Sequence, residues 1–200
     1  MEIPKLSLSL GQIAWALNFG QDPPQLMRDQ LNYLRQLGVP EKVTTKKAGS
    51  GNRITYDYDD LIECGVALFA VNHGMKYTDV KNALVPHRST MRQIYRDAIS
   101  QHPEACLDDK DWIKMHGKGI AIHGHDIYLR LHDRYAESRG KIDTVGQEEM
   151  EATKDIIYFM GLVERFPDGC SRYWIPISML ALQWTYWARI APPIKAGRKS

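Results

Sequence analysis

The first hundred residues alternate between apolar stretches at helical spacing and short turn-forming stretches. A first helix is predicted from about Leu10 to Leu17, because its apolar residues are three or four positions apart. Ser9 and Gln12 precede and open it in the S-x-x-Q form of a capping box, which satisfies the first free amides of a helix. The segment from 18 to 23 is predicted to be a turn.

A second helix is predicted from Pro24 to Leu37. Pro24 suits the first helical position, where its missing N–H costs nothing, and Gly38 suits the position just after the last helical residue. The predicted inward side consists of Leu26, Met27, Leu31, Leu34 and Leu37. The opposite, polar side consists of Gln25, Arg28, Asp29, Asn32, Arg35 and Gln36.

Residues 42–56 follow this helix and predict a hairpin-like loop. Val43–Thr45 and Ile54–Tyr56 favour extended structure, and glycines at 49 and 51 permit a tight reversal between them. The loop is therefore predicted to form two short strands with a tip near residues 48–52.

Three further helices are predicted before residue 101. Asp57 or Asp59 can cap the first of them, and Thr78 can cap the second, which Pro86 closes. A third, short helix is predicted from Ser89 to Ser100. The residues expected to face inward are Leu61, Cys64, Leu68 and Val71 in the first helix, Val80, Ala83 and Leu84 in the second, and Met91, Ile94, Tyr95 and Ala98 in the third.

The C-terminal half predicts a smaller α+β domain. Between Lys114 and Tyr135, the alternation of apolar residues favours a hairpin, although Asp126 could instead cap a helix. A helix is predicted over 146–166 and a strand over 172–177, whose proline suggests an edge position. The apolar segment 175–190 is interrupted by polar residues, which favours a buried or interfacial element over a membrane span.

Composition narrows the class of protein only slightly. The apolar fraction is 44% and the charged fraction 25%, as in ordinary soluble proteins, and the formal net charge is only +2. Charge distribution is more informative, because Lys42–Arg53 holds four basic residues and no acidic one. Three widely spaced cysteines suggest reduced thiols and a cytoplasmic location.

The basic loop and the preceding helix are the candidate nucleic-acid interface. Amides and arginines near a helix N-terminus can read base edges in a major groove, and loop lysines can contact phosphates. The candidate residues are Gln25, Arg28, Asn32, Tyr33, Arg35, Lys46, Lys47, Asn52, Arg53 and Tyr56. For either element alone, a solvated surface is the competing interpretation.

Residues of about 6–86 resemble the winged helix-turn-helix domain of the MerR family of transcription regulators. The resemblance rests on the wing sequence 51–56, on Asp59-Asp60-Leu61, on the segment Gly74–Leu84 and on 33–38 at the end of the recognition helix. It implies duplex DNA binding, usually as a dimer on a near-palindromic site. Where the family has a long dimerisation helix after Leu84, this chain has only the short helix 89–100.

Two other groups of residues are candidate sites. The aromatic side chains Trp174, Trp184, Tyr186 and Trp187 suit a hydrophobic core first, a dimer interface second and a ligand pocket third. No zinc-ligand spacing is matched by the four histidines His116, His123, His125 and His132, so no metal is expected. No catalytic motif is found, so we expect neither an enzyme nor a cofactor.

The sequence thus predicts a mainly α protein with small β elements. Residues 1–86 would form the winged helix-turn-helix, 87–111 a short helix and linker, 112–191 a dimerisation or sensing domain, and 192–200 a basic tail. The predicted function is sequence-specific, homodimeric binding of double-stranded DNA by helix 24–37 and wing 42–56. The alternative is an adaptor on the same scaffold that binds a protein and not DNA, which Asn32 favours because the family has an arginine there. A protein partner or small effector would bind the C-terminal half.

Overall fold

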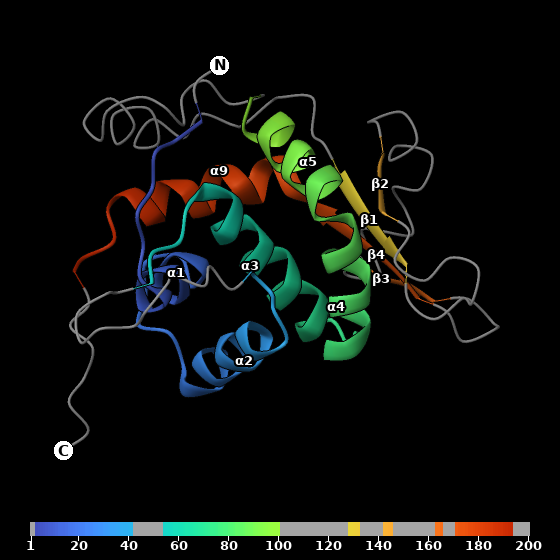
Figure 1. Cartoon of the computed structure of the whole chain (residues 1–200), viewed down its shortest axis with the longest axis horizontal. Coiled ribbons are helices and arrows are strands. Elements are labelled where there is room, and N and C mark those ends of the chain that lie inside the picture. Colours follow the sequence, from blue (N-terminus) through green and yellow to red (C-terminus); the bar gives the residue numbers. More distant parts are fainter. Residues whose placement is uncertain are drawn as a thin grey trace.

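The protein is mainly helical and has a small antiparallel sheet at one side (Figure 1). The computed structural model describes residues 3–41, 54–100, 128–132, 142–145, 163–165 and 171–193. The helices are α1 (Leu10–Leu17), α2 (Gln25–Gln36), α3 (Tyr58–Asn72), α4 (Tyr77–Leu84), the 3₁₀ helix η1 (Val85–His87), α5 (Arg88–Ser100) and α9 (Ile177–Arg189). The strands are β1 (Tyr128–His132), β2 (Ile142–Val145), β3 (Val163–Arg165) and β4 (Ser171–Pro176).

Helix α3 lies at the centre, with α1, α2, α4, α5 and α9 packed around it. All of its residues from Tyr58 to Leu68 are buried, on every side of the helix. The expectation of one inward face was therefore incomplete, since Val71 is only partly buried while Asp59, Asp60 and Glu63 are buried. A helix surrounded on all sides cannot be recognised from amphipathic spacing.

The first two helices follow the sequence prediction closely. The capping box of Ser9 and Gln12 is present at α1, and α2 spans Gln25–Gln36 with Pro24 as its N-cap residue. Gly38 follows α2 with φ of +87°, a conformation that glycine adopts without strain. Two expectations were wrong. Pro24 has extended backbone and precedes the first helical residue, Gln25. Leu26 is 69% exposed, because it lies on the outer side of the first turn of α2.

The next three helices form an almost continuous run. Asp57 caps α3 through a reciprocal capping box with Asp60. Helix α4 begins after Lys76, so Thr78 lies inside the helix and does not cap it as expected. Pro86 is in η1, which leads directly into α5. The inward residues predicted for α4 and α5 are all buried.

Tyr56 forms an isolated antiparallel bridge with Leu8. The two residues exchange backbone hydrogen bonds, with N···O distances of 2.9 Å in both directions. Ile54–Tyr56 is therefore not a strand in the described part of the chain, and its one bridge joins it to the residues before α1. The predicted partner strand Val43–Thr45 lies outside the described residues.

The four strands form one antiparallel sheet in the order β2-β1-β4-β3. Strand β1 confirms the extended interpretation of the residues near 128–131, whereas Ile120–Ile122 lies outside the described residues. The helix expected over 146–166 was wrong at its end, where β3 pairs with β4. The edge position expected for β4 was also wrong, because Pro176 is its last residue and leaves the strand free to pair on both sides.

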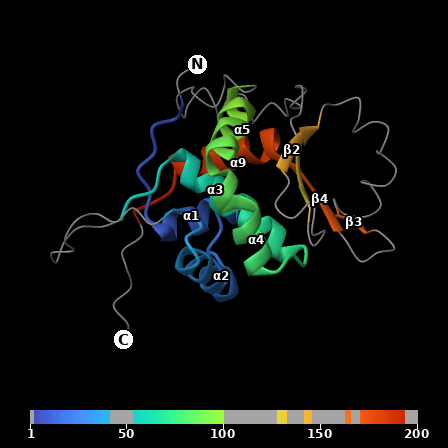
Figure 2. The ribbon, with the colours of Figure 1, turned by 45° about the vertical axis from the view of Figure 1, so that its right-hand side comes forward.

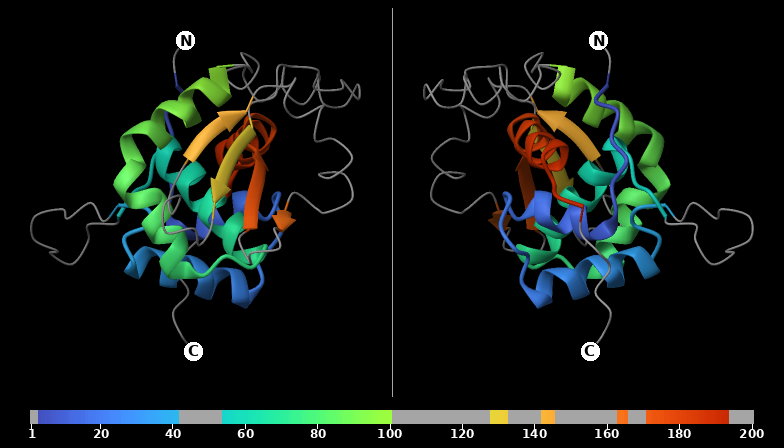
Figure 3. Two further views of the ribbon diagram at one scale, coloured as in Figure 1. Left: turned by 90° about the vertical axis from the view of Figure 1, so that its right-hand side faces the viewer. Right: turned by 90° about the vertical axis from the view of Figure 1, so that its left-hand side faces the viewer.

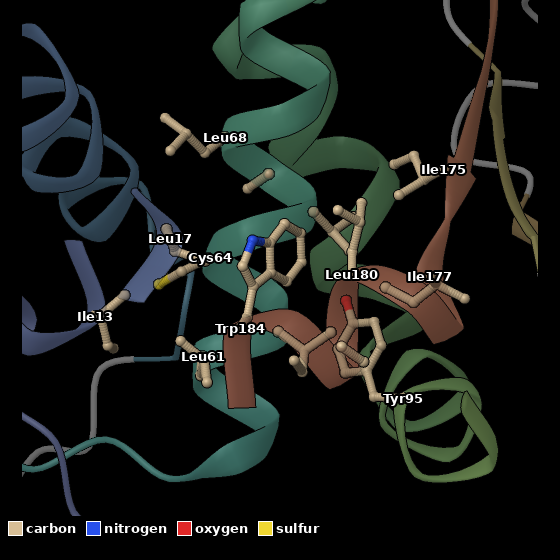
Figure 4. Packing of buried hydrophobic residues seen from close by; sticks show 14 of the residues in the cluster. Ile13, Leu17, Leu61, Cys64, Leu68, Tyr95, Ile175, Ile177, Leu180 and Trp184 are labelled. Carbon is tan, nitrogen blue, oxygen red and sulfur yellow. The ribbon is translucent and has the colours of Figure 1, made fainter. Parts of the chain in front are cut away.

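Helix α9 connects the C-terminal segment to the N-terminal helices. It packs against α1, α3 and α5, and Figure 3 shows it nearly end-on beside α3 and α5. Trp184 points from α9 toward α3 in the buried cluster drawn in Figure 4. The sheet lies at the opposite end of the molecule from α1 (Figure 2).

The described part of the predicted C-terminal domain thus shares one core with residues 8–99. The wider division of the chain at residues 86 and 112 stays a prediction, because most of 101–170 lies outside the described residues. None of the helices in the described ranges is long and apolar enough to cross a membrane.

Candidate nucleic-acid interface

Helix α2 presents a mostly polar outer surface over a buried apolar underside. Leu31 and Leu34 are fully buried beneath it, and α1 and α3 pack against it. The exposed residues of α2 are Gln25, Leu26, Asp29, Tyr33 and Gln36, whereas Arg28, Asn32 and Arg35 are half-buried. The two buried leucines fix the orientation of the helix, and the outer surface is free to contact a partner.

Arg28 is held at the start of α2 by two contacts. Its Nε donates to the Pro23 carbonyl at 3.0 Å, and its Nη2 forms an ion pair with Asp22 at 2.6 Å. The Arg28 side chain is 41% exposed and that of Asp22 is 90% exposed. Ion pairs this open to water contribute at most about 1 kcal/mol, so a stronger anion can replace Asp22.

The other candidates on α2 differ in their partners. The Gln25 amide donates to Asp29 one turn later at 2.8 Å. The Tyr33 ring packs edge-on against Tyr77 of α4, with ring centroids 4.8 Å apart. Asn32 has no hydrogen-bond partner anywhere in the described part of the chain, so its amide is available to a ligand.

Tyr56 is an anchor and not a surface contact. Only 4% of it is exposed, and burial raises the pKa of its hydroxyl, against a smaller opposing effect of a hydrogen bond from Arg35. The expectation that Tyr56 touches nucleic acid is therefore not met by its position. Its bridge to Leu8 fixes the chain where the basic loop ends.

The remaining wing candidates, Lys46, Lys47, Asn52 and Arg53, lie outside the described residues. The two ends of their segment can be placed. Glu41 lies 3.7 Å from Arg92 of α5, and Tyr56 is held by Leu8. The loop therefore starts and ends on the helical core.

A ladder of ion pairs joins α3 to α5. At one end, the Arg88 guanidinium binds Glu63 through three hydrogen bonds of 2.7–3.2 Å. It also donates to the Gly38 carbonyl at 2.7 Å, at the end of α2. Glu63 is only 2% exposed, so this pair is almost fully removed from water.

The ladder continues one and two turns along α5. Arg92 lies 4.0 Å from Asp60, and Arg96 binds Asp59 at 2.7 Å. This ladder was not predicted from the sequence. Its signal was present as three arginines spaced four residues apart, at 88, 92 and 96, which share one side of a helix.

Asp60 is the group in the ladder whose titration should make the stability of the protein depend on pH. Burial raises its pKa to about 6; the nearby charges of Asp57 and Glu63 also raise it, against the lowering effects of the Asp57 amide hydrogen bond and of Arg92. In the unfolded chain an aspartate has a pKa near 3.9. The folded protein therefore takes up a proton at Asp60 as the pH falls through about 6, before the unfolded chain does.

The Asp60 contribution to stability is accordingly full at low pH and is lost as the pH rises through about 6. We expect wild type to gain stability relative to Asp60→Asn as the pH is lowered from 7.5 to 4.5. Urea unfolding of both proteins across this range measures the difference. A difference that stays constant with pH would contradict the buried state of this carboxyl.

One of the aromatic candidates lies in the core, and two pack against it. Trp184 is buried, and Trp187 packs edge-on against Trp15 with ring centroids 5.7 Å apart and against Tyr186 at 5.0 Å. Trp174 lies in β4. Packing inside one chain thus accounts for Trp184, in line with the first of the three roles considered.

His132 lies in β1, and the histidines at 116, 123 and 125 lie outside the described residues. Within the described ranges, no group of three or more His, Cys, Asp or Glu side chains could hold a metal ion. Cys64 is a buried free thiol whose pKa is raised by burial. Comparisons of the chain with models of protein families, with curated proteins and with solved structures found no match.

Proposed function

We propose that this protein is a winged helix-turn-helix transcription regulator that binds duplex DNA as a homodimer. The observation that supports it is the arrangement of α2, whose polar outer surface is directly followed by the basic segment 42–53. Helix α2 enters the major groove, and the basic segment is the wing that contacts the backbone.

The reading helix needs a rigid support and free polar groups. The buried side of α2 supplies the support through Leu31 and Leu34. Gln25 and Asn32 supply amides of the kind that pair with adenine edges, and arginine is the usual partner of guanine. On binding DNA, Arg28 breaks its ion pair with the exposed Asp22 carboxylate and contacts a base or a phosphate instead.

The wing supplies affinity without sequence information. Four basic residues and no acidic one between Lys42 and Arg53 give a local positive charge on a nearly neutral protein. Contacts of this kind fix the register of a protein on the duplex. Glu41 on one side of this segment contacts Arg92, and Tyr56 on the other side is bridged to Leu8.

The test is a salt titration of DNA binding. We expect a duplex selected from random sequences to bind with an affinity that falls as salt rises. Changing Lys46, Lys47 and Arg53 together to alanine should weaken binding and reduce the slope of log K against log salt by about one for each phosphate that the variant no longer neutralises. Fluorescence anisotropy of labelled duplex measures both quantities.

The matched control removes the same charge elsewhere, with Lys110, Lys114 and Lys118 changed to alanine. This variant should keep most of the affinity of the wild type. If the unmodified protein shows no preference for duplex DNA over heparin at low salt, the proposal fails.

One observation favours the adaptor alternative. Leu26 and Phe19 are large apolar side chains that are 69% and 47% exposed at and before the start of α2, which is unusual for a surface that only contacts DNA. Under this alternative, the unmodified protein has no affinity for duplex DNA and the wing variant changes nothing. The same titration therefore separates the two functions.

A further inference from the structure

A pocket of about 430 Å³ lies between α1 and the start of α2. Leu10 and Trp15 of α1 line one side, and Pro23, Arg28 and Asn32 line the other; Pro192, just after α9, completes it. The volume falls within the range of small-molecule sites, which is roughly 300–1,000 Å³. No residue of this pocket was singled out in the sequence as a small-molecule site.

The walls of the pocket suit a flat apolar body. Leucine, alanine and proline side chains form most of the lining, together with the indole of Trp15. That indole is held in place by its edge-on contact with Trp187, 5.7 Å between centroids. A fixed aromatic face of this kind binds another ring by stacking or edge contact.

The polar end of the pocket has more donors than acceptors. A guanidinium carries five N–H donors, and Arg28 uses one on the Pro23 carbonyl and one on Asp22, which leaves three. Asn32 adds an amide with no hydrogen-bond partner in the described part of the chain. Asp22, the acceptor at this end, is 90% exposed and can leave.

We propose that this pocket binds a small aromatic carboxylate. The ring lies against Trp15, Pro23 and Leu10, and the carboxylate accepts hydrogen bonds from Arg28 and Asn32 in place of Asp22. Planar, two-point binding of a carboxylate is the interaction for which arginine is best suited. The mixture of a flat apolar body and one anionic end distinguishes this ligand from neutral aromatics and from phosphate.

Occupation of the pocket also affects DNA binding, and this consequence rests on the proposed function. Arg28 and Asn32 are candidate base-contacting residues, and a carboxylate that holds both removes them from the groove. The ligand and DNA therefore compete for the same two side chains. The pocket is an effector site within the reading unit and not in the C-terminal half.

The binding experiment uses the full chain without DNA. Benzoate, cinnamate, 1-naphthoate and 2-naphthoate are titrated by calorimetry, each beside its uncharged amide. We expect at least one carboxylate to bind at least tenfold more tightly than its amide, because only the carboxylate accepts charge-assisted hydrogen bonds from Arg28.

Three variants locate the binding site. Arg28→Met keeps the stem and removes the donors, Asn32→Leu removes the amide, and Gly11→Leu adds a side chain to the pocket wall. Arg28→Met and Gly11→Leu should each weaken carboxylate binding at least tenfold, whereas Arg92→Met on α5 should not. Circular dichroism confirms that each variant is folded. If Gly11→Leu does not fold, Asn32→Leu replaces it as the second variant that locates the site.

Absence of binding by all four carboxylates at millimolar concentration overturns the proposal. So does binding that is unchanged in both Arg28→Met and Asn32→Leu. DNA affinity without ligand is measured separately. If the protein binds 2-naphthoate but not DNA, the pocket proposal stands and the proposed function fails. If both bind and saturating carboxylate leaves DNA affinity unchanged, the competition is overturned.

Discussion

Replacing Arg88 by alanine is expected to lower the free energy of unfolding by about 3–5 kcal/mol, the loss typical when one partner of a buried ion pair is removed. The variant leaves Glu63 with its charge in a site that is 2% exposed and with no other hydrogen bond from a described residue. It also leaves the Gly38 carbonyl, at the end of α2, without the Arg88 donor. Urea unfolding monitored by circular dichroism measures the change in stability.

Two controls identify the cause of this destabilisation. Arg28→Ala removes an arginine from an exposed pair and should cost at most about 1 kcal/mol. Changing Glu63 and Arg88 together to methionine removes both charges, so the double variant should be more stable than Arg88→Ala. An Arg88→Ala variant as stable as Arg28→Ala would show that the pair is open to water in solution.

The sequence predicted the local features of the N-terminal helices well because those features depend on neighbouring residues. Ser9 and Gln12 form their capping box, Asp57 caps α3, and Gly38 takes the left-handed conformation that ends α2. Each depends on a few consecutive side chains and the adjacent backbone. Thr78 failed as a cap because Lys76 occupies that position, two residues earlier than expected.

Features set by distant segments could not be predicted in this way. The burial of α3 on all sides depends on α9, more than a hundred residues later. The central position of β4 depends on β1 and β3 pairing with its two edges, which no local pattern indicates. Periodicity reports one buried face, and it fails for a helix that neighbours cover on every side.

The candidate site shows the same division. The exposed face of α2 follows from helical spacing and was largely predicted, whereas the exposure of Leu26 and the burial of Tyr56 depend on tertiary contacts. The pocket beside Arg28 and Asn32 brings Leu10 close to Pro192, from opposite ends of the chain. Only the folded arrangement of α1, α2 and Pro192, three residues beyond α9, reveals it.

Replacing Trp184 by alanine is expected to destabilise the protein by about 3–5 kcal/mol, because the large ring fills the contact between α9 and α3. On α3, Gly65 provides the space for this ring: a Cβ there would lie 2.3 Å from the nearest Trp184 ring atom. Gly65→Ala should therefore cost about 1–3 kcal/mol in the wild type through overpacking. Thermal and urea unfolding measure both effects.

The effect of Gly65→Ala should change sign when Trp184 is absent. Without the indole there is no clash, and alanine in the middle of a helix is then more stable than glycine by about 0.5–1 kcal/mol. Gly65→Ala should thus stabilise the Trp184→Ala protein. In a Trp187→Ala background it should still destabilise, because the nearest atoms to a Cβ at Gly65 all belong to Trp184. An equal cost in all three backgrounds would mean that α9 does not dock on α3 through Trp184, and that the C-terminal segment stands apart from the N-terminal helices.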